Sequence, residues 1–165
     1  MNGKTDAVTV QDWLKLPNPI QEPGHELIMT VMLVSRMLSN AGRLLLRKSG
    51  LTEAQFNILM LLKYQFTDGA TQVGLSRCVL VNRANVTGLI DRLERDKLVQ
   101  RGTQNGDRRI KIVTITPKGL KCLLVAEASY FEGIRKVAEW VPATDQKKTG
   151  QTLLHLCKLL SGNIS

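Results

Sequence analysis

The chain has 165 residues, of which 43% are hydrophobic and only 4% aromatic, and a formal net charge of +9 at pH 7. This length fits one domain, or one domain with an extension, and the composition favours helices packed through Leu, Val and Ile. It excludes a membrane-spanning helix, because residues 27–34 form the most apolar run and Thr30 interrupts it. The first 16 residues lack the apolar region of a signal peptide, and three scattered cysteines fit reduced thiols, so a cytoplasmic protein is expected.

Positive charge concentrates in residues 71–121, which hold 11 Lys and Arg against 4 Asp and Glu. A surface charged only for solubility would spread this excess more evenly. The pattern therefore favours nucleic acid as the anionic partner, and no membrane partner is expected. Because no Ser/His/Asp grouping, phosphate-binding glycine loop or paired carboxylates stand out, neither enzyme activity nor a cofactor is expected.

The first predicted elements are an extension and a long helix. Within residues 1–22, Thr9 caps a helical turn that reaches Leu16 and that two prolines stop. The long helix covers residues 23–48, with apolar side chains on one face and Gly50 just beyond its end.

Three shorter helices follow at the spacing of a helix-turn-helix. Thr52 caps the first, and a turn ending at Gly69 leads to the second, which Thr71 caps and which covers residues 72–80. Asn82 caps the third. The inward positions of the first two are Phe56, Leu59, Met60, Leu62, Leu75 and Val79.

A hairpin and two more helices complete the prediction. Strands over residues 98–101 and 110–116 flank Asn105-Gly106, which has the chemistry of a tight turn. A Thr-Pro pair starts a helix over residues 117–139, and Thr144 caps a last helix to residue 160. The expected fold class is mainly α with a small β wing, a winged helix-turn-helix between long helices.

The helix after Asn82 has one apolar and one polar face at helical spacing. Its inward stripe is Val86, Leu89, Ile90 and Leu93. Its outer side carries Ala84, Thr87, Gly88, Asp91 and Arg95, with Asn85 and Arg92 at the flanks. In the first turn, Arg83, Asn85 and Thr87 are predicted to read base edges in a major groove. Arg92 and Arg95 lie further along and are predicted to contact phosphates.

The hairpin tip, Asn105-Gly106-Asp107-Arg108-Arg109, is the second DNA-binding feature. Arg108 is assigned to DNA, whereas Asp107 would repel phosphates and is expected to pair with Arg109 or another arginine. The alternative to DNA binding is that the helix after Asn82 is an ordinary amphipathic helix whose charged face is only solvated. The arginines at the hairpin tip favour DNA binding over this alternative. The predicted DNA-binding residues are Thr71, Gln72, Arg83, Ala84, Asn85, Thr87, Arg92, Arg95, Gln104, Asn105, Arg108, Arg109 and Lys111.

The segments NRANVTGLIDRLERD, VQRG and GDRRIKIVTITPKG occur in this order, and together they resemble the MarR family of bacterial transcriptional regulators. The resemblance covers about residues 24–161. It implies a homodimeric repressor whose two winged helices bind a palindromic operator, with half-sites roughly 34 Å apart. It also implies a small aromatic or lipophilic anion that releases the DNA.

The resemblance further implies a division into residues 1–22, 23–50, 51–116 and 117–165, with the second and fourth parts forming the dimer. Residues named for dimerisation are Leu27, Val31, Val34, Leu153, Leu156 and Leu160. Lys97 stands where the family usually has glycine, which would cost about 1 kcal/mol if that position is left-handed.

The means of regulation stays open at this stage. A reactive Cys78 beside Arg77 would make a redox switch, although a buried inert thiol is favoured. His25 and His155 lack neighbouring ligands for a metal. Trp13 either covers a ligand pocket or fastens the extension to the core. The alternative function is a winged-helix dimer that binds a protein or RNA.

Overall fold

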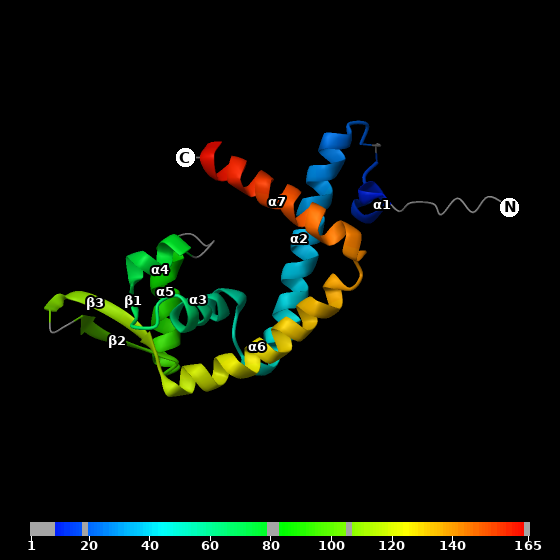
Figure 1. Cartoon of the computed structure of the whole chain (residues 1–165). Helices are drawn as coiled ribbons and strands as arrows, with labels where there is room; N and C mark the ends of the chain where they lie inside the picture. Colours follow the sequence, from blue (N-terminus) through cyan, green and yellow to red (C-terminus); the bar gives the residue numbers. More distant parts are fainter. Residues whose placement is uncertain (1–8, 18–19, 79–82, 105–106, 164–165) are drawn as a thin grey trace. The chain divides into compact units, whose positions relative to one another are not determined.

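The computed structural model describes residues 9–17, 20–78, 83–104 and 107–163, without the side chains of residues 83–84, 104, 107–110 and 163. The chain divides into two compact units, one ending at Leu44 and the other beginning at Leu45. Helices dominate, and a three-stranded antiparallel sheet lies in the second unit (Figure 1). The predicted fold class is confirmed, and the four-part division stays a prediction.

The first unit contains a short helix, α1 (Val10–Leu14), and most of a long one, α2 (Pro23–Leu46). The predicted cap is present, because the Asp12 carboxylate accepts hydrogen bonds from the Thr9 amide at 2.8 Å and hydroxyl at 2.6 Å. The turn ends two residues earlier than predicted, since Lys15 adopts a left-handed φ of 51°.

The α-helical part of α2 also ends earlier than predicted, at Leu46, and a 3₁₀ helix, η1 (Arg47–Ser49), follows it. The Ser49 hydroxyl donates to the Leu46 carbonyl at 2.7 Å, which stabilises this tighter turn. Gly50 then ends the segment with a left-handed φ of 70°, as expected of a glycine after a helix.

Three helices build the predicted helix-turn-helix: α3 (Glu53–Tyr64), α4 (Gln72–Cys78) and α5 (Arg83–Arg95). The Thr52 hydroxyl accepts from the Gln55 amide at 3.3 Å, and the Thr71 hydroxyl accepts from the Gly74 amide at 3.1 Å, so both predicted caps are confirmed. Val79 and Asn82 lie outside the described residues. The most deeply buried core side chains of these helices are Ile58, Leu59, Leu62, Leu75, Val86, Ile90 and Leu93.

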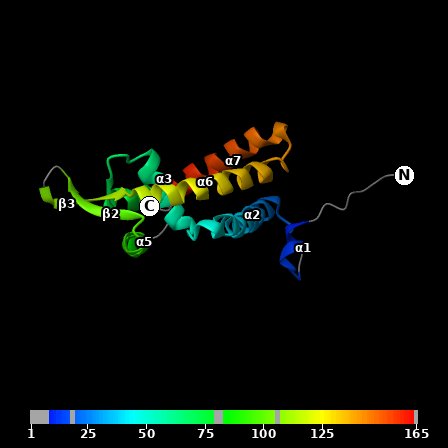
Figure 2. The same cartoon turned by 90° about the horizontal axis from the view of Figure 1, so that it is seen from below.

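The sheet has the order β1-β3-β2, built from β1 (Ala70–Thr71), β2 (Val99–Gln104) and β3 (Asp107–Ile115). Both long strands are longer than predicted, because cross-strand pairing continues from Val99↔Ile115 to Gln104↔Asp107. The predicted strand list missed β1, whose two residues are too few to give an alternating pattern. The β2–β3 hairpin projects beyond the three helices as the wing (Figure 2).

The start of α6 (Pro117–Ala138) packs against the corner between α5 and β2, and the contacts come from Thr116, Lys118 and Gly119. The Thr116 hydroxyl donates to the Lys97 carbonyl at 2.7 Å and accepts from the Gly119 amide at 3.0 Å, which confirms the predicted cap. Lys118 donates to the Asp96 carbonyl at 2.8 Å. A Cβ on Gly119 would lie 2.0 Å from the Leu98 carbonyl oxygen, so only glycine allows this approach.

The last helix, α7 (Ala143–Asn163), begins one residue before the predicted cap, so Thr144 lies inside its first turn. The Pro142 carbonyl accepts from the amides of Asp145 at 2.8 Å and Gln146 at 3.1 Å, which starts the helix earlier. Few side chains of α7 are covered within the protomer, and Leu154 is 71% exposed. In the part of the chain that the structure describes, no helix is long and apolar enough to cross a bilayer.

A partly buried ion pair joins α3 to α6. Lys63 Nζ lies 2.5 Å from Glu127 Oε2, and Glu127 Oε1 is buried without a hydrogen-bond partner among the described residues. The hydrogen bond that the Lys63 ammonium donates to the Glu127 carboxylate raises the pKa of Lys63. A raised lysine pKa stabilises the fold below the unfolded pKa of 10.5, and this contribution is lost as pH rises through the folded pKa.

Removing one partner of this pair is expected to destabilise the protein more than removing both. Lys63→Met leaves the Glu127 carboxylate buried and unpaired, whereas adding Glu127→Leu removes that charge. Thermal unfolding should therefore give a lower Tm for Lys63→Met than for the double variant, and the double variant should lose less stability above pH 10.5 than the wild type. Equal Tm values for the single and double variants would contradict this.

Candidate nucleic-acid interface

The two faces of α5 are divided as the sequence predicted. Val86, Ile90 and Leu93 are fully buried and Leu89 is 4% exposed, so the inward stripe is confirmed. The outer side presents exposed polar side chains to solvent. These are Asn85, Thr87, Asp91, Arg92 and Arg95. The burial of one face fixes which side chains are free to meet a ligand.

One hydrogen bond and one side-chain contact organise the exposed face. The Gln72 side-chain amide donates to the Thr87 hydroxyl, which connects α4 to α5. The Arg92 guanidinium lies over Gly88, where a Cβ would stand 3.8 Å from Arg92 Nη1. Thr71 is engaged in capping α4, so its hydroxyl already has a structural role. Several polar side chains on the exposed face of α5 and its neighbour α4 are therefore held in place by contacts with neighbouring groups.

Arg101, on β2, clamps the wing to α5, and sequence reasoning missed it. Its guanidinium donates to Asp91 Oδ1 at 2.5 Å and to the Glu94 carboxylate, while its backbone amide donates to Glu94 Oε1 at 3.1 Å. The hydrogen bonds that Arg101 donates to Asp91 and, to a smaller extent, to Glu94 hold the pKa of Arg101 above its usual range. The sequence did contain an indication of this role. Two carboxylates on a helix that faces DNA need a nearby cation to offset their repulsion of phosphates.

The corner between α5 and β2 has the geometry of a Schellman motif, with Lys97 at the position that glycine usually takes. The Leu98 amide donates to the Leu93 carbonyl at 2.8 Å and the Lys97 amide to the Glu94 carbonyl at 2.9 Å. Lys97 has a left-handed φ of 60°, as its place in the sequence suggested. The side chain is exposed, so the strain lies in its backbone.

Lys97→Gly is expected to stabilise the protein by about 0.5–1 kcal/mol, because glycine adopts this φ without a Cβ penalty. Lys97→Ala is the matched control, since alanine removes the same charge and keeps the strain. Urea unfolding should show the gain for glycine and no comparable gain for alanine. If both variants shifted the midpoint equally, the side chain rather than the backbone would be responsible.

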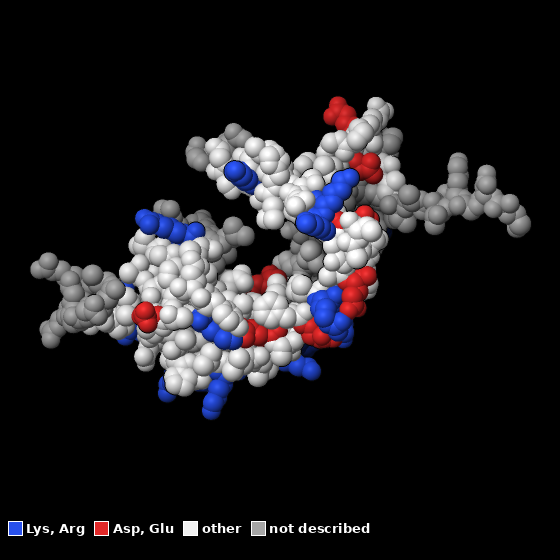
Figure 3. All heavy atoms as spheres, in the orientation of Figure 1, with Lys and Arg blue, Asp and Glu red and all other residues white. Residues whose placement is uncertain are grey.

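The wing is described only in part. Lys111 is exposed on β3, and the backbone of Asp107–Ile115 forms that strand. Figure 3 shows lysine and arginine side chains projecting from several parts of the surface of the second unit. Asn105 lies outside the described residues, and nothing in the description bears on the side chains of Arg83, Ala84, Gln104, Asp107, Arg108 and Arg109. Their predicted roles stay predictions.

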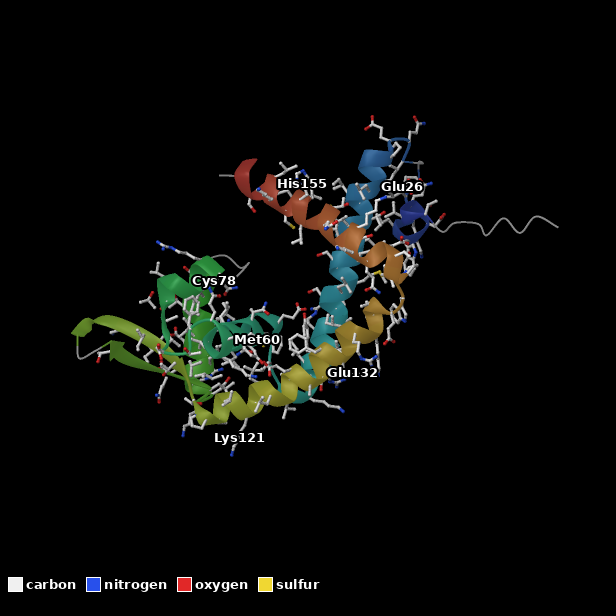
Figure 4. The ribbon with its side chains drawn as sticks, viewed as in Figure 1. Glu26, Met60, Cys78, Lys121, Glu132 and His155 are labelled. Atoms are coloured by element: carbon white, nitrogen blue, oxygen red, sulfur yellow. The ribbon has the colours of Figure 1, made fainter. Side chains whose placement is uncertain are left out.

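The predicted burial of Cys78 is wrong, because this thiol is exposed at the end of α4 (Figure 4). Cys157 is also exposed, whereas Cys122 is half-buried, its thiol contacts the Ser49 carbonyl at 3.5 Å, and burial raises its pKa. His25 is exposed in the first turn of α2, as expected of a helix-start residue. Among the residues that the structure describes, no three His, Cys, Asp or Glu side chains could hold a metal ion.

Comparison with known proteins shows which family these elements resemble. The sequence model of the MarR family matches residues 49–110, from just before α3 into β3. The chain is 34% identical over 99 residues to the transcriptional activatory protein BadR of Rhodopseudomonas palustris, a match that spans 59% of this chain and 57% of BadR. It is 29% identical over 114 residues to the HTH-type transcriptional repressor YetL of Bacillus subtilis, spanning 69% of this chain and 68% of YetL.

The fold is also similar to a solved structure, that of CouR from Rhodococcus jostii bound to p-coumaroyl-CoA. This comparison has a TM-score of 0.71 and 25% identity, and covers 83% of this chain and 95% of CouR. The winged helix-turn-helix is therefore similar to the MarR family over residues 49–110, and the fold is similar to that of CouR over most of the chain.

Proposed function

We propose that this protein is a transcriptional regulator of the MarR type that binds a palindromic double-stranded operator as a homodimer and acts as a repressor. The observation that carries the proposal is the exposed polar face of α5, held to the wing by Arg101. Asn85 and Thr87 read base edges from the first turn, with Arg83, and Arg92 and Arg95 neutralise phosphates further along. The names of BadR and YetL, both transcriptional, support this class of function.

Unpartnered apolar surfaces support the homodimer. On α2, Leu27 is 52% exposed and Val34 is 45% exposed, and on α7 Leu160 is 48% exposed. Monomeric proteins seldom leave so many large apolar side chains on one helix in contact with water. A second copy that packs against α2, α6 and α7 buries them, and the twofold axis of such a dimer gives the operator its palindrome.

One face of α2 has the chemistry to bind the predicted anionic ligand. A hollow of about 850 Å³ lies along Val31, Met32, Ser35, Arg36, Ser39, Asn40 and Arg43. Two guanidinium groups beside hydroxyl and apolar side chains suit a carboxylate or phosphate on an apolar body. CouR was solved with p-coumaroyl-CoA, an anionic aromatic thioester, which supports this class of ligand. Binding there releases the operator.

Lys111→Ala tests the electrostatic part of this proposal. The exposed Lys111 ammonium lies on the wing strand β3 and is expected to neutralise one phosphate. Its loss should weaken binding to all duplexes about tenfold or less, without changing sequence preference, and lower the slope of log K against log salt by about 1. Lys121→Ala, at an exposed site on α6, is the control and should change neither quantity. An unchanged salt slope for Lys111→Ala would remove this residue from the interface.

A further inference from the structure

A small pocket in the first unit lies between α1 and α2, well apart in sequence from the DNA-binding helices. It has a volume of about 280 Å³. Its walls are Val10 and Trp13 from α1 and Glu26, Thr30, Leu33, Val34 and Met37 from α2. Small-molecule sites are mostly apolar pockets of about 300–1,000 Å³ with a few placed polar groups. This pocket lies just below that range, so it suits only a small ligand.

The α1 wall is fastened in place by several contacts. Val10 is only 5% exposed, and the Gln11 side chain accepts a hydrogen bond from the Ile20 amide at 2.8 Å, which closes the connection between α1 and α2. Trp13 nevertheless leaves 60% of its surface exposed. A Trp that served only to fasten the extension would be covered by α2. Its exposed ring is instead available to a molecule in the pocket.

The polar group of the pocket is acidic. Glu26 lies in the first turn of α2 beside α1 (Figure 4), and its carboxylate has no hydrogen-bond or ion-pair partner among the described residues. The Thr30 hydroxyl donates to the Glu26 backbone carbonyl at 2.8 Å, so it does not satisfy the carboxylate. An indole face and a free carboxylate on apolar walls together attract a cation, through cation–π and ion-pair interactions.

We propose that this pocket binds a small organic ammonium with an apolar body, with Glu26 pairing the charge and Trp13 lying against the cation or its apolar body. The charge preference is opposite to that of the arginine-bearing face of α2, so this is a second ligand site rather than part of the first. The inference does not rest on DNA binding, because it uses only contacts within the first unit.

Three probes with the same apolar body and different charge test the proposal: 2-phenylethylamine, 2-phenylethanol and phenylacetate. Trp140→Phe in the full chain leaves Trp13 as the single indole, and Trp140 is 80% exposed, so this change is not expected to disturb the fold. Titration followed by Trp13 fluorescence should show the amine binding about tenfold more tightly than the alcohol. Phenylacetate should bind most weakly at this site.

Glu26→Gln is the decisive variant, because it keeps the size of the side chain and removes its charge. It should bring the amine and the alcohol within about twofold of each other, whereas Glu22→Gln, outside the pocket walls, should leave the preference intact. Equal binding of amine and alcohol by the parent protein would overturn the proposal, as would an unchanged preference in Glu26→Gln. Val34 is also assigned to the dimer interface, so a second copy of the chain could fill the pocket. In that case no probe would change Trp13 fluorescence, and this result would also overturn the proposal.

Discussion

Arg101→Gln is expected to weaken operator binding about 100-fold, or ~2.7 kcal/mol, although Arg101 is not assigned to any DNA contact. Its guanidinium pairs with Asp91 and Glu94 on α5. Glutamine leaves both carboxylates uncompensated close to the phosphates, and juxtaposed like charges cost several kcal/mol in an interface. The wing also loses the contact that sets its angle to α5. Fluorescence anisotropy with a labelled operator measures the effect.

A double-mutant cycle separates this clamp from a direct phosphate contact. Asp91→Asn with Glu94→Gln removes both carboxylates and keeps the shape of the side chains. In that background, Arg101→Gln should cost less than about fivefold, because there is no longer a charge to compensate. A further 100-fold loss there would assign Arg101 to the DNA itself. Circular dichroism and thermal unfolding should show that each variant keeps its helices.

Leu153→Asp combined with Leu160→Asp is expected to convert the dimer to a monomer and to lower operator affinity about 1,000-fold. Both side chains are exposed on α7 in the protomer, at 38% and 48%. In the proposed dimer they are buried, and two unpaired carboxylates cannot be accommodated in an apolar interface. A monomer then binds through one half-site, and the loss of the linked second site weakens binding by a factor of roughly 100 to 10,000.

Sedimentation velocity gives the oligomeric state of this variant directly. Gln151→Asp is the matched control, because helical spacing puts Gln151 on the opposite side of α7 from the Leu153 and Leu160 stripe. It should remain a dimer and keep its affinity. A Leu153→Asp, Leu160→Asp variant that stayed dimeric would show that the interface lies elsewhere.

The sequence predicted the winged helix-turn-helix well because its determinants are local. Thr52 and Thr116 cap helices through neighbours within three residues, and the apolar stripe of α5 repeats at helical spacing. The resemblance to the MarR family marked Lys97 as a position where glycine is usual, and its φ of 60° is indeed left-handed. Each of these features is decided by residues within one or two turns.

The parts that the sequence did not predict depend on contacts between distant residues. The Arg101 clamp joins a strand to a helix seven and ten residues away, and the Lys63–Glu127 pair joins residues 64 apart. The strand β1 has only two residues and exists because it pairs with Val113 and Ile112. Burial of Cys78 was wrongly predicted from the general tendency of free thiols to be buried, whereas this thiol lies at the exposed end of the short helix α4.

Selection of duplex DNA from a random pool by the 165-residue protein is the most direct test of sequence-specific binding by a homodimer. The arrangement of α5, wing and dimer helices predicts enrichment of a palindrome whose half-site centres lie about one helical turn, ~34 Å, apart. Binding to that palindrome should have a stoichiometry of two protomers per duplex. Enrichment of no palindrome, together with binding that is equally strong for any duplex, would contradict the proposed function.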